Sequence, residues 1–494
     1  MLTERFPGNH VRYGPNKLIF NTAEALRDIY GVGSLSKVVK ASAYEPLVHR
    51  APNTLTIRGG KEHARRRRIM AQGVSDKAQR GYEHRISSHI ARFCDVMFGT
   101  QDMKTKQLQR TWSEPMDMAN WCKRDEPQAI FFVEPPQLTM NTLAGYYLSF
   151  DIMADVVFGA HYNLLQNDRF RYVVDSIDKS NIRMSFLIQF PQFAKLKIDK
   201  YIFREAIGAR NRFIKFVTRL VGERLGKVTT TSPEKVNPED ADVFANLAAA
   251  KDPETGGGFT LNEIAAESTT LVVAGADTSS VAFGAILFYL ADNKSAYDRA
   301  AAEVRSKFQS TDELAMGADL ASCVYLYACI NEALRMSPPV GLALWREVAT
   351  SNLVVDGQAV AGGCDVGVPL YAIHHDAKYY TDPFEYRPER WLVDDGTGSV
   401  ERARSVFNPF SLGMRSCLGK SLAMTEMALT AATILLKGDF RFAEGTKGLI
   451  GRGRKDGPWG RHRHNEYQLF DYVTGQKNGP FLQFSRRASS NSSN

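Results

Sequence analysis

The sequence has few cysteines, no long apolar run and no recognisable signal peptide. Six cysteines in 494 residues are too few for a disulfide-stabilised scaffold, and none form the CxxC pair of zinc ribbons or thioredoxin-like proteins. The nearest candidate for a membrane span, residues 271–291, carries Asp277, and a charge within lipid is costly. We therefore interpret this stretch as a helix buried in protein, and we expect this sequence to be soluble or peripheral to a membrane.

The chain carries a moderate excess of positive charge. Its formal net charge is +8, from 62 lysines and arginines against 54 acidic residues. The basic residues cluster at 61–68 and 451–464, and neither cluster is interleaved with aromatic residues in the manner of a base-stacking surface. We therefore expect no binding to nucleic acid. We interpret each cluster as a solvated basic face, which would suit an acidic protein partner or an anionic membrane surface.

Apolar content and periodicity predict a mainly helical globular protein. Hydrophobic residues make up 44% of the chain, which excludes wholesale disorder. Helical periodicity dominates, and a capping box, Thr260 with Glu263, precedes a helix predicted over 262–291. No linker clearly separates domains. We predict one large domain over residues 1–494, mainly α with small β-sheets, in which residues 486–494 form a frayed tail.

Short strand patterns flank the helical region. Apolar and β-branched residues predict strands at 17–20, 346–349 and 366–371. Near the end of the chain, 467–473 and 481–484 are predicted to pair as a hairpin around a turn that contains glycine and asparagine.

The most informative segment is FSLGMRSCLG at residues 410–419. It places Cys417 at the start of an apolar helix, where unsatisfied N–H groups and the helix dipole lower the pKa of a thiol. Gly413 and Gly419 would let a flat ligand approach the backbone, and Arg415 supplies a cation for an acidic group on that ligand. A lone cysteine is most often an inert core residue, so the prediction depends on this flanking pattern.

The pattern FxxGxRxCxG resembles the cysteine loop of the cytochrome P450 family. Four further signals resemble the same family in order, and the resemblance covers about residues 10–485. AGADT at 274–278 is similar to the oxygen-binding segment of the family's long helix, where Gly275 is expected to weaken the helix and Thr278 to open a groove. HHD at 374–376 is similar to the passage before the family's meander. The second half of the sequence resembles fungal microsomal members of the family.

Two segments resemble a structural network of the family. EALR at 332–335 could be only a surface ion pair, since residues three apart share a helix face. Followed by PERW at 388–391, it resembles the family's buried network of one glutamate and two arginines, here Glu332, Arg335 and Arg390. The resemblance assigns these three residues to folding and haem retention.

The resemblance implies haem b, iron protoporphyrin IX, with the thiolate of Cys417 as its axial ligand. The positions that match the family's cofactor-binding residues are His63, Arg67, Ala274, Gly275, Arg346, Phe410, Gly413, Arg415, Cys417 and Gly419. The family more often has tryptophan at the position of His63. Of the arginines at 65–68, the resemblance implies that Arg67 points inward, toward the cofactor. The other three are expected near the cysteine side of the haem, as a basic patch for an acidic flavoprotein.

The implied activity is that of a haem-thiolate monooxygenase, which inserts one oxygen atom from O2 into a lipophilic small molecule. Asp277 and Thr278 are the implied catalytic pair, because a hydroxyl backed by a carboxylate can relay the protons that O–O cleavage needs. Substrate contacts are expected from apolar segments such as 44–48 and 340–344. A fungal secondary metabolite is expected as substrate, by analogy at the level of the family.

The electron source is expected to be another protein. Gly31-Val32-Gly33 lacks the third glycine of a dinucleotide loop, and no convincing flavin motif is found. NADPH–cytochrome P450 reductase is therefore the expected partner of a monomeric enzyme. Two alternatives stay open. One is a haem-thiolate enzyme that couples or rearranges substrates without hydroxylation, and the other is a non-catalytic haem-binding protein.

Family members of this length normally begin with a membrane helix and a proline-rich hinge, and neither is recognisable before the first predicted strand. Either the native anchor is missing from this sequence or the native protein is soluble, and the early start of the first predicted strand favours a missing anchor. With that anchor, the native protein would lie on the cytosolic face of the endoplasmic reticulum membrane.

Overall fold

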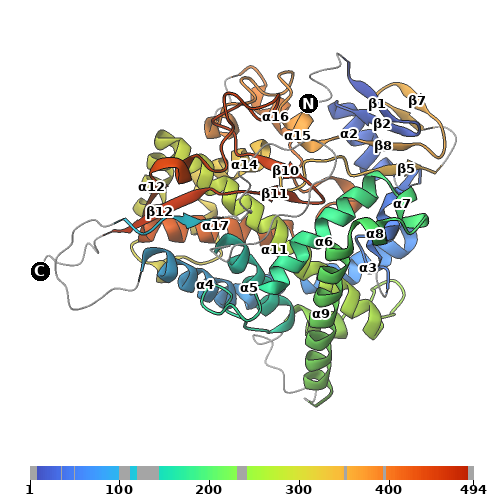
Figure 1. Cartoon of the computed structure of the whole chain (residues 1–494), viewed down its shortest axis with the longest axis horizontal. Coiled ribbons are helices and arrows are strands. Elements are labelled where there is room, and N and C mark those ends of the chain that lie inside the picture. Colours follow the sequence, from blue (N-terminus) through green and yellow to red (C-terminus); the bar gives the residue numbers. More distant parts are fainter. Residues whose placement is uncertain are drawn as a thin grey trace, which may run out of the picture.

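The structure is a computed structural model that describes residues 8–34, 36–48, 51–99, 112–118, 144–230, 242–349, 353–392 and 396–487. Helices form most of it and the sheets are small, which confirms the predicted mainly α fold (Figure 1). The predicted frayed tail is wrong at Arg486, which belongs to strand β12 (Phe481–Arg486), and its residues from 488 onward lie outside the described ones. The long helix α11 (Leu261–Asp292) crosses the middle of the molecule, and the other elements are arranged around it (Figure 1).

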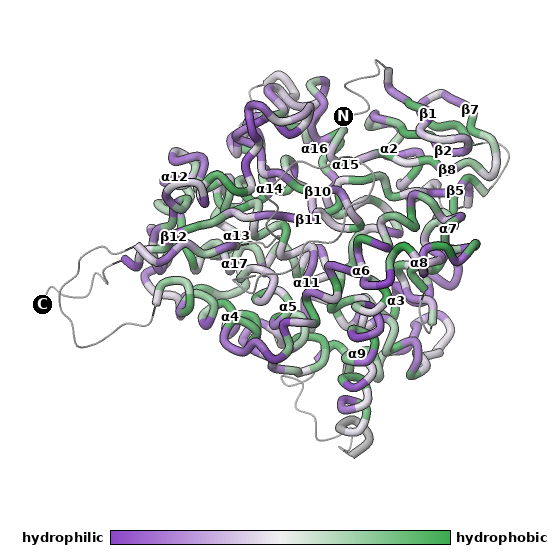
Figure 2. The backbone as a smooth tube through the Cα atoms, viewed as in Figure 1, coloured by the Kyte–Doolittle hydropathy of each residue, from purple (hydrophilic) through white to green (hydrophobic). Residues whose placement is uncertain are grey.

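Helix α11 begins at the predicted capping box. Thr260 Oγ1 accepts a hydrogen bond from the Glu263 N–H at 3.3 Å, and the Glu263 carboxylate accepts one from the Thr260 N–H at 2.8 Å. The helix packs on α5 (Ala144–Phe158) and α14 (Val324–Met336). It is long and apolar enough to cross a membrane (Figure 2), but 72% of its most apolar 18-residue stretch is buried within the protein. It is therefore a core helix.

The remaining helices surround α11. The longer ones are α2 (Ala23–Tyr30), α3 (Gly60–Gly73), α4 (Asp76–Phe98), α6 (Tyr172–Gln189), α9 (Arg204–Thr230), α10 (Val243–Ala249), α12 (Lys294–Lys307), α16 (Ser399–Val406) and α17 (Lys420–Lys437). The short ones are α7 (Gln192–Lys195), α8 (Asp199–Ile202), α13 (Ala318–Ala321) and α15 (Leu370–His374). Helices α6 and α9 pack on each other, and both contact α5 (Figure 1).

A five-stranded sheet lies at one end of the molecule (Figure 1). Its strands, in spatial order, are β1 (His10–Gly14), β2 (Lys17–Phe20), β8 (Asp365–Gly367), β5 (Arg346–Val348) and β3 (Val38–Lys40). The register places Lys40 opposite Arg346. The predicted strands at 17–20 and 346–349 are confirmed. The strand predicted over 366–371 is too long, because Pro369 ends the extended backbone and leads into α15.

The C-terminal strands pair differently from the prediction. Strand β10 (Leu469–Asp471) pairs with β11 (Gly475–Lys477). Strand β12 (Phe481–Arg486) pairs with β9 (Gly438–Phe442) on one side and with β4 (Met116–Asp117) on the other. Earlier in the chain, β6 (Leu353–Val355) pairs with β7 (Gln358–Val360). The predicted hairpin between 467–473 and 481–484 is therefore wrong. The intervening segment β11 is buried against α11 and returns along β10 before the chain reaches β12.

A buried ion network fixes the loop that leads to the cysteine segment. The Glu332 carboxylate on α14 accepts hydrogen bonds from Arg335 Nε at 2.9 Å and from Arg390 Nε at 2.8 Å. Arg335 also donates to the backbone carbonyls of His374 and Pro383, each at 2.7 Å. Glu332 and Arg335 are fully buried. The structure thus contains the predicted glutamate–arginine–arginine network, which ties α14 to the segment 374–390 that follows it in the chain.

Candidate active site

The cysteine segment forms a tight loop directly before α17. Cys417 lies three residues before the first residue of this helix, and Gly419 occupies the N-cap position. The Cys417 N–H donates to the Phe410 carbonyl at 2.8 Å and so closes the loop. The sequence prediction placed the cysteine at the start of a helix, and the structure agrees. The backbone carbonyl of Phe410 thus holds the cysteine in place.

The two glycines of this loop have different surroundings. Gly413 has a φ of +64°, and a Cβ there would lie 2.4 Å from the Tyr30 carbonyl oxygen at the end of α2. Gly413 is thus required by packing of the loop on α2, which differs from the close approach of a ligand that the sequence suggested. A Cβ at Gly419 would meet nothing nearer than Cys417 Sγ at 3.9 Å, so this glycine leaves room beside the thiol.

Opposing effects act on the Cys417 thiol. Its side chain is accessible, yet protein atoms surround it closely, and this partial burial raises its pKa above the usual value. The Gly419 N–H, Arg67 and Lys420 act in the opposite direction. The lowered pKa expected from the helix start alone is therefore wrong for the free thiol, because burial outweighs these contributions. Coordination of a metal ion would favour the thiolate.

Arg67 on α3 reaches the residue that precedes the cysteine. Its Nη1 donates to the Ser416 carbonyl at 2.5 Å, and its Nη2 donates to Ser416 Oγ at 3.1 Å. Burial lowers the pKa of Arg67, and Cys417 is the charge that acts against this effect. Within the arginine run at 65–68, Arg67 thus faces the cysteine loop, as the resemblance to the family implied.

The other arginines of this run are compensated by acidic side chains. Their ion pairs are Arg65–Glu62 at 2.8 Å, Arg66–Glu263 at 2.6 Å and Arg68–Asp252 at 2.6 Å. Arg66 is buried and also lies 3.3 Å from Glu267. The free basic patch that the sequence suggested at these three positions is therefore not formed, because each charge has a partner within the fold.

Five basic side chains from separate parts of the chain converge next to the cysteine loop. They are Lys40 on β3, His63 and Arg67 on α3, Arg346 on β5, and Arg415 in the cysteine segment; the other four all act electrostatically on His63. Lys40, His63 and Arg346 are buried, and the other two are half-buried. Within the described ranges, no carboxylate lies within ion-pair distance of Lys40, Arg67, Arg346 or Arg415.

Burial and mutual repulsion depress the pKa values in this cluster. Burial, followed by repulsion from Lys40, lowers the pKa of His63 to about 3. Burial and repulsion from Arg346 lower the pKa of Arg415 to about 10. Buried cations without counter-charges are costly, so the cluster is suited to an anionic ligand. The two carboxylates of haem b fit both the charge of the cluster and its position beside Cys417.

Ala274 and Thr278 lie one turn apart on the same face of α11. Ala274 is exposed, and the Thr278 hydroxyl is accessible and donates to the Ala274 carbonyl at 2.7 Å. Helix α11 is continuous through this segment, so the local opening expected at Thr278 is not present. The hydroxyl is nevertheless placed where a rotation about its χ1 angle would redirect its proton away from the helix.

Gly275 faces a neighbouring helix. A Cβ at this position would lie 2.6 Å from Met153 Sδ on α5. The absence of a side chain therefore permits the close packing of α5 on α11. This contact differs from the predicted role of Gly275 in binding the cofactor and in weakening the helix.

The Asp277 carboxylate is bound by residues of α6 and β11. Asn181 Nδ2 donates to Asp277 Oδ2 at 2.7 Å, and the Thr474 hydroxyl donates to the same oxygen. Lys477 Nζ lies 3.9 Å from Asp277 Oδ1. The Asp277 carboxylate was expected to support the Thr278 hydroxyl in a proton relay, but these three partners hold it and the Thr278 hydroxyl donates to Ala274 instead. Asp277 thus connects the central helix to the two elements that cover it.

Sequence reasoning missed three residues that the structure brings to this region: Lys40, Asn181 and Lys477. None of them belongs to a recognisable motif. Lys40 ends a short apolar strand, and Lys477 precedes an Asn-Gly turn, so both resemble ordinary surface lysines in the sequence. Their burial depends on strand pairing and on packing against α11, for which the sequence offers no local signal.

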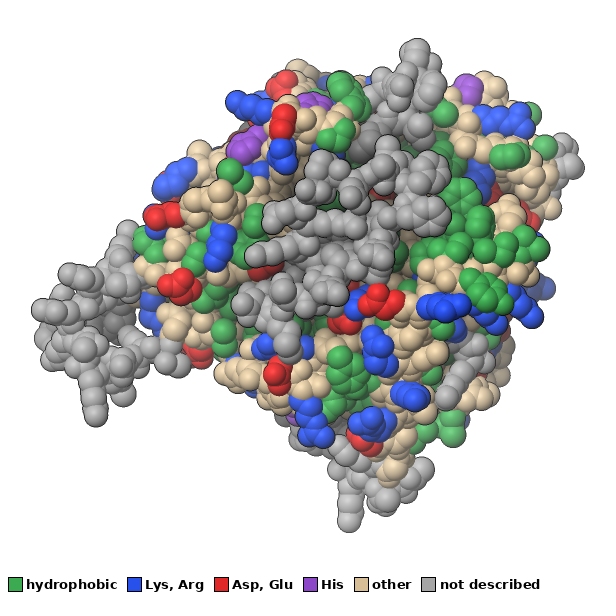
Figure 3. All heavy atoms as spheres, in the orientation of Figure 1, with side chains coloured by type: hydrophobic (Ala, Val, Ile, Leu, Met, Phe, Trp, Pro, Cys, Tyr) green, Lys and Arg blue, Asp and Glu red, His purple; other side chains and the backbone are tan. Residues whose placement is uncertain are grey.

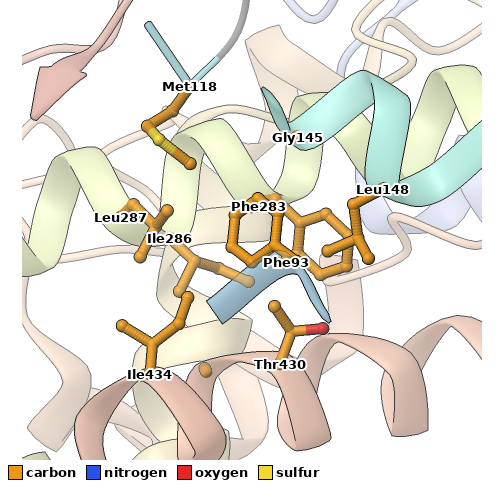
Figure 4. A pocket seen from close by; sticks show the side chains of 10 residues that line it. Phe93, Met118, Gly145, Leu148, Phe283, Ile286, Leu287, Thr430 and Ile434 are labelled. Atoms are coloured by element: carbon orange, nitrogen blue, oxygen red, sulfur yellow. The ribbon is translucent and has the colours of Figure 1, made fainter. Parts of the chain in front are cut away.

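Two internal cavities differ in what they can hold. The first, shown in Figure 4, lies between α4, α5, α11 and α17, where Phe93, Phe283 and Ile434 contribute to its wall. Its volume of about 10 Å³ leaves room for one water molecule at most. This cavity is therefore a packing defect of the core and is too small for a substrate.

The second cavity has a volume of about 230 Å³. It lies between the five-stranded sheet, residues 341–343 and strand β10, and its wall includes Tyr13, Trp345 and Leu469. It borders the segment 340–344, from which substrate contacts are expected. Its size and largely apolar wall suit a small lipophilic molecule or one part of a larger one.

One further cluster in the described part of the chain offers metal ligands. His89 Nε2 and His161 Nδ1 lie 3.0 and 3.2 Å from Asp155 Oδ2. Arg85 donates to Asp155 Oδ1 at 3.0 Å, and Arg92 Nη1 lies 3.4 Å from His89 Nδ1. Because arginine can only donate, His89 Nδ1 accepts and its proton faces Asp155. Two guanidinium groups and this proton disfavour a cation, so we interpret the cluster as a hydrogen-bonded one.

Comparisons of the sequence with known proteins identify its family. The sequence model of the cytochrome P450 family matches residues 36–450. A cytochrome P450 monooxygenase of Gibberella zeae is 47% identical over 460 residues, which cover 93% of this chain and 97% of that protein. Cytochrome P450 monooxygenase AKT7 of Alternaria alternata is 40% identical over 484 residues, covering 97% and 86%. Cytochrome P450 monooxygenase poxM of Penicillium oxalicum is 41% identical over 479 residues, covering 97% and 83%. The chain belongs to the cytochrome P450 family and is a P450 monooxygenase.

Proposed function

We propose that this P450 monooxygenase binds haem b through the thiolate of Cys417 and inserts one oxygen atom from O2 into a lipophilic small molecule. When bound, haem supplies the activation of O2 that this insertion requires. The observation that carries the proposal is the convergence of buried basic side chains next to Cys417, without a carboxylate partner among the described residues.

The arginines of the cluster are oriented by the backbone. Arg415 donates to the carbonyls of Ile57 at 3.1 Å and Arg58 at 2.7 Å. Arg346 donates to the carbonyls of Leu344 and Trp345 at 3.2 and 3.1 Å. A guanidinium has five N–H donors, so donors remain on both side chains for the carboxylates of haem. These arginines, with His63 and Arg67, would hold the cofactor by its acidic edge.

Thr278 and Asp277 would have separate roles. The Thr278 hydroxyl is the accessible proton donor on α11, and it would leave the Ala274 carbonyl in order to donate into the active site. Asp277 is fixed by Asn181, Thr474 and Lys477, so it would act first as a positioning residue that keeps α6 and β11 over this face of α11.

A lipophilic substrate is supported by the apolar cavity beside residues 341–343. The similar proteins are fungal monooxygenases, and a fungal secondary metabolite remains our proposal for the substrate class. P450 monooxygenases generally take electrons from a redox partner. We propose NADPH and NADPH–cytochrome P450 reductase as the source for this enzyme, which would act as a monomer.

The surface around α7 and α8 supports contact with a membrane. Figure 3 shows hydrophobic side chains gathered in this area of the molecule. Leu196 and Tyr201 are 68% and 73% exposed, and Lys195 and Lys197 lie beside them in the sequence. Apolar side chains flanked by lysines suit the interface of an anionic lipid bilayer. We propose that the native protein lies on the cytosolic face of the endoplasmic reticulum membrane.

Turnover with isotopically labelled O2 tests the proposed reaction. The purified protein, NADPH and a fungal NADPH–cytochrome P450 reductase would be incubated with a panel of terpenoids, polyketides and aromatic alkaloids. The expected product carries one labelled oxygen atom. Products that form only by coupling or rearrangement, without labelled oxygen, would contradict monooxygenation while leaving haem binding intact.

A further inference from the structure

We propose that Lys40 is an additional cofactor-binding residue, whose ammonium group binds the carboxylates of haem directly. This inference rests on the haem binding proposed above. Lys40 belongs to none of the short motifs by which the sequence resembles the P450 family, and its place in the cation cluster comes from the structure alone.

The strand pairing brings Lys40 into the cluster. Lys40 is the last residue of β3, and the register of the sheet places it opposite Arg346 on β5. Lys40 is only 6% exposed, and its Nζ lies 5.9 Å from the centre of the Tyr44 ring. Of the charged groups that act on His63, Lys40 has the largest effect. The ammonium group therefore lies among the side chains that would hold the acidic edge of the cofactor.

The hydrogen bonds of Lys40 leave one donor unused. An ammonium group has three N–H donors. Two of them donate to the carbonyls of Thr54 at 2.7 Å and Leu55 at 2.5 Å. Within the described ranges, the third has no acceptor. The one carboxylate that acts noticeably on Lys40 belongs to Glu267, and it already accepts hydrogen bonds from the Thr54 N–H and from Arg66.

The charge of Lys40 is thus buried without compensation. Burial, followed by repulsion from Arg346, Arg415 and Arg67, lowers the pKa of Lys40 well below its ordinary value. An ammonium group in such a place is expected to lose its proton unless an anion compensates it. A ligand with two carboxylates beside Arg346 and Arg415 would restore the charge and would accept the unused N–H.

Lys40 also has a structural role, and the effect of its charge on the cofactor must be distinguished from that role. Its two carbonyl partners belong to the loop before α3, and Arg58 Nε in that loop donates back to the Lys40 carbonyl at 2.8 Å. This loop leads to His63 and Arg67. Loss of the side chain would therefore disturb the cluster even if the ammonium group made no contact with the cofactor.

Two substitutions distinguish the structural role of Lys40 from the effect of its charge. Lys40→Gln keeps two N–H donors for the carbonyls of Thr54 and Leu55 and removes the charge. Lys40→Arg keeps the charge. Lys37→Gln removes the same charge from an exposed position three residues earlier and serves as the matched control. The measurements are the midpoint potential of the haem iron in the purified holoenzyme and the rate of haem transfer to excess apomyoglobin.

For K40Q we expect a lower midpoint potential, because reduction adds negative charge near a site that has lost a cation. We also expect haem loss about tenfold faster, which is the typical effect of one charge-assisted hydrogen bond. K40R and K37Q should match the wild type. A K40Q protein with the potential and haem-loss rate of K37Q would overturn the inference and leave Lys40 a purely structural role.

If K40Q does not fold, K40R decides the question. An unchanged potential in K40R supports the inference, and a lowered potential at full haem content contradicts it, since the charge is still present. Failure of the wild type to bind haem would overturn the proposed function instead, so the two failures can be told apart.

Discussion

The guanidinium of Arg67 donates a 2.5 Å hydrogen bond to the backbone carbonyl of Ser416, the residue directly before Cys417. A second hydrogen bond joins the same guanidinium to Ser416 Oγ at 3.1 Å. These contacts connect α3 to the cysteine loop across 349 positions of sequence. They place a cation beside the thiol and beside the cluster that would hold the carboxylates of haem.

Replacement of Arg67 by methionine is expected to weaken haem binding. The variant loses a cation of the cluster and the support of the Ser416 backbone, and we expect haem loss about tenfold faster. Arg68→Met is the matched control, because Arg68 pairs with Asp252 and makes no contact with the cysteine loop. Haem-to-protein ratios and transfer to apomyoglobin would be measured. Equal haem loss from both variants would speak against this role of Arg67.

Thr278→Ala is expected to retain haem and to divert reducing equivalents from product to hydrogen peroxide, because the accessible hydroxyl of α11 is lost. Thr269→Ala is the control. The Thr269 hydroxyl makes the same type of bond, to the Ala265 carbonyl, elsewhere on the helix. NADPH consumption, peroxide and product would be quantified together. Unchanged coupling in the Thr278 variant would refute its role as proton donor.

Asp277 and Lys477 are expected to depend on each other for stability. Asp277→Asn removes the carboxylate charge that lies 3.9 Å from the buried Lys477 ammonium group, and Lys477→Met removes the cation from beside that carboxylate. Removing one member of a buried ion pair costs about 3 kcal/mol or more. The double variant should be less destabilised than the sum of the two single variants. Additive losses in denaturant unfolding would show that the two groups do not interact.

Glu426 on α17 is expected to make stability depend on pH. Burial raises its pKa to about 8, against a usual value of 4.5, and the Ser279 hydroxyl donates to it at 2.9 Å. The protonated folded state is favoured, so this contribution is full below pH 4.5 and is lost as the pH rises through 8. Between these values, stability should fall by about 1.4 kcal/mol per pH unit.

The variant Glu426→Gln keeps the shape of the side chain and cannot ionise, so its unfolding profile should lack this decline. Glu444→Gln, at an exposed position paired with Arg441, is the control and should keep the wild-type profile. Thermal unfolding midpoints between pH 5 and pH 9 would be compared. The same slope in all three proteins would exclude Glu426 as its source.

Features set by local sequence could be predicted well. The capping box of Thr260 and Glu263 marks the start of α11, and the resemblance of EALR and PERW to the family's motifs implied the network that the structure contains. The position of Cys417 before a helix is likewise local, because glycine and the following apolar residues determine where α17 begins. For these elements, the interacting groups lie close together in the sequence or belong to one recognisable motif.

Features that depend on distant partners could not be predicted. The Asp277 carboxylate was expected to support the Thr278 hydroxyl in a proton relay, but Asn181 and Lys477, from α6 and β11, hold it. Gly275 was expected to face the cofactor, but it faces Met153 on α5. In both cases the helix orientation follows from packing against other elements. A single sequence contains the residues of such contacts without indicating which of them meet.

The most direct test of the account is the absorption spectrum of the reduced protein bound to carbon monoxide. For the wild type we predict a Soret band shifted strongly to the red of that of histidine-ligated haem proteins, since a thiolate donates electron density to the iron. Cys364→Ala, which removes another free and partly exposed cysteine, should keep this band, and Cys417→Ala should lose it. A wild-type band at the ordinary position, or a red-shifted band in the Cys417 variant, would contradict ligation by Cys417.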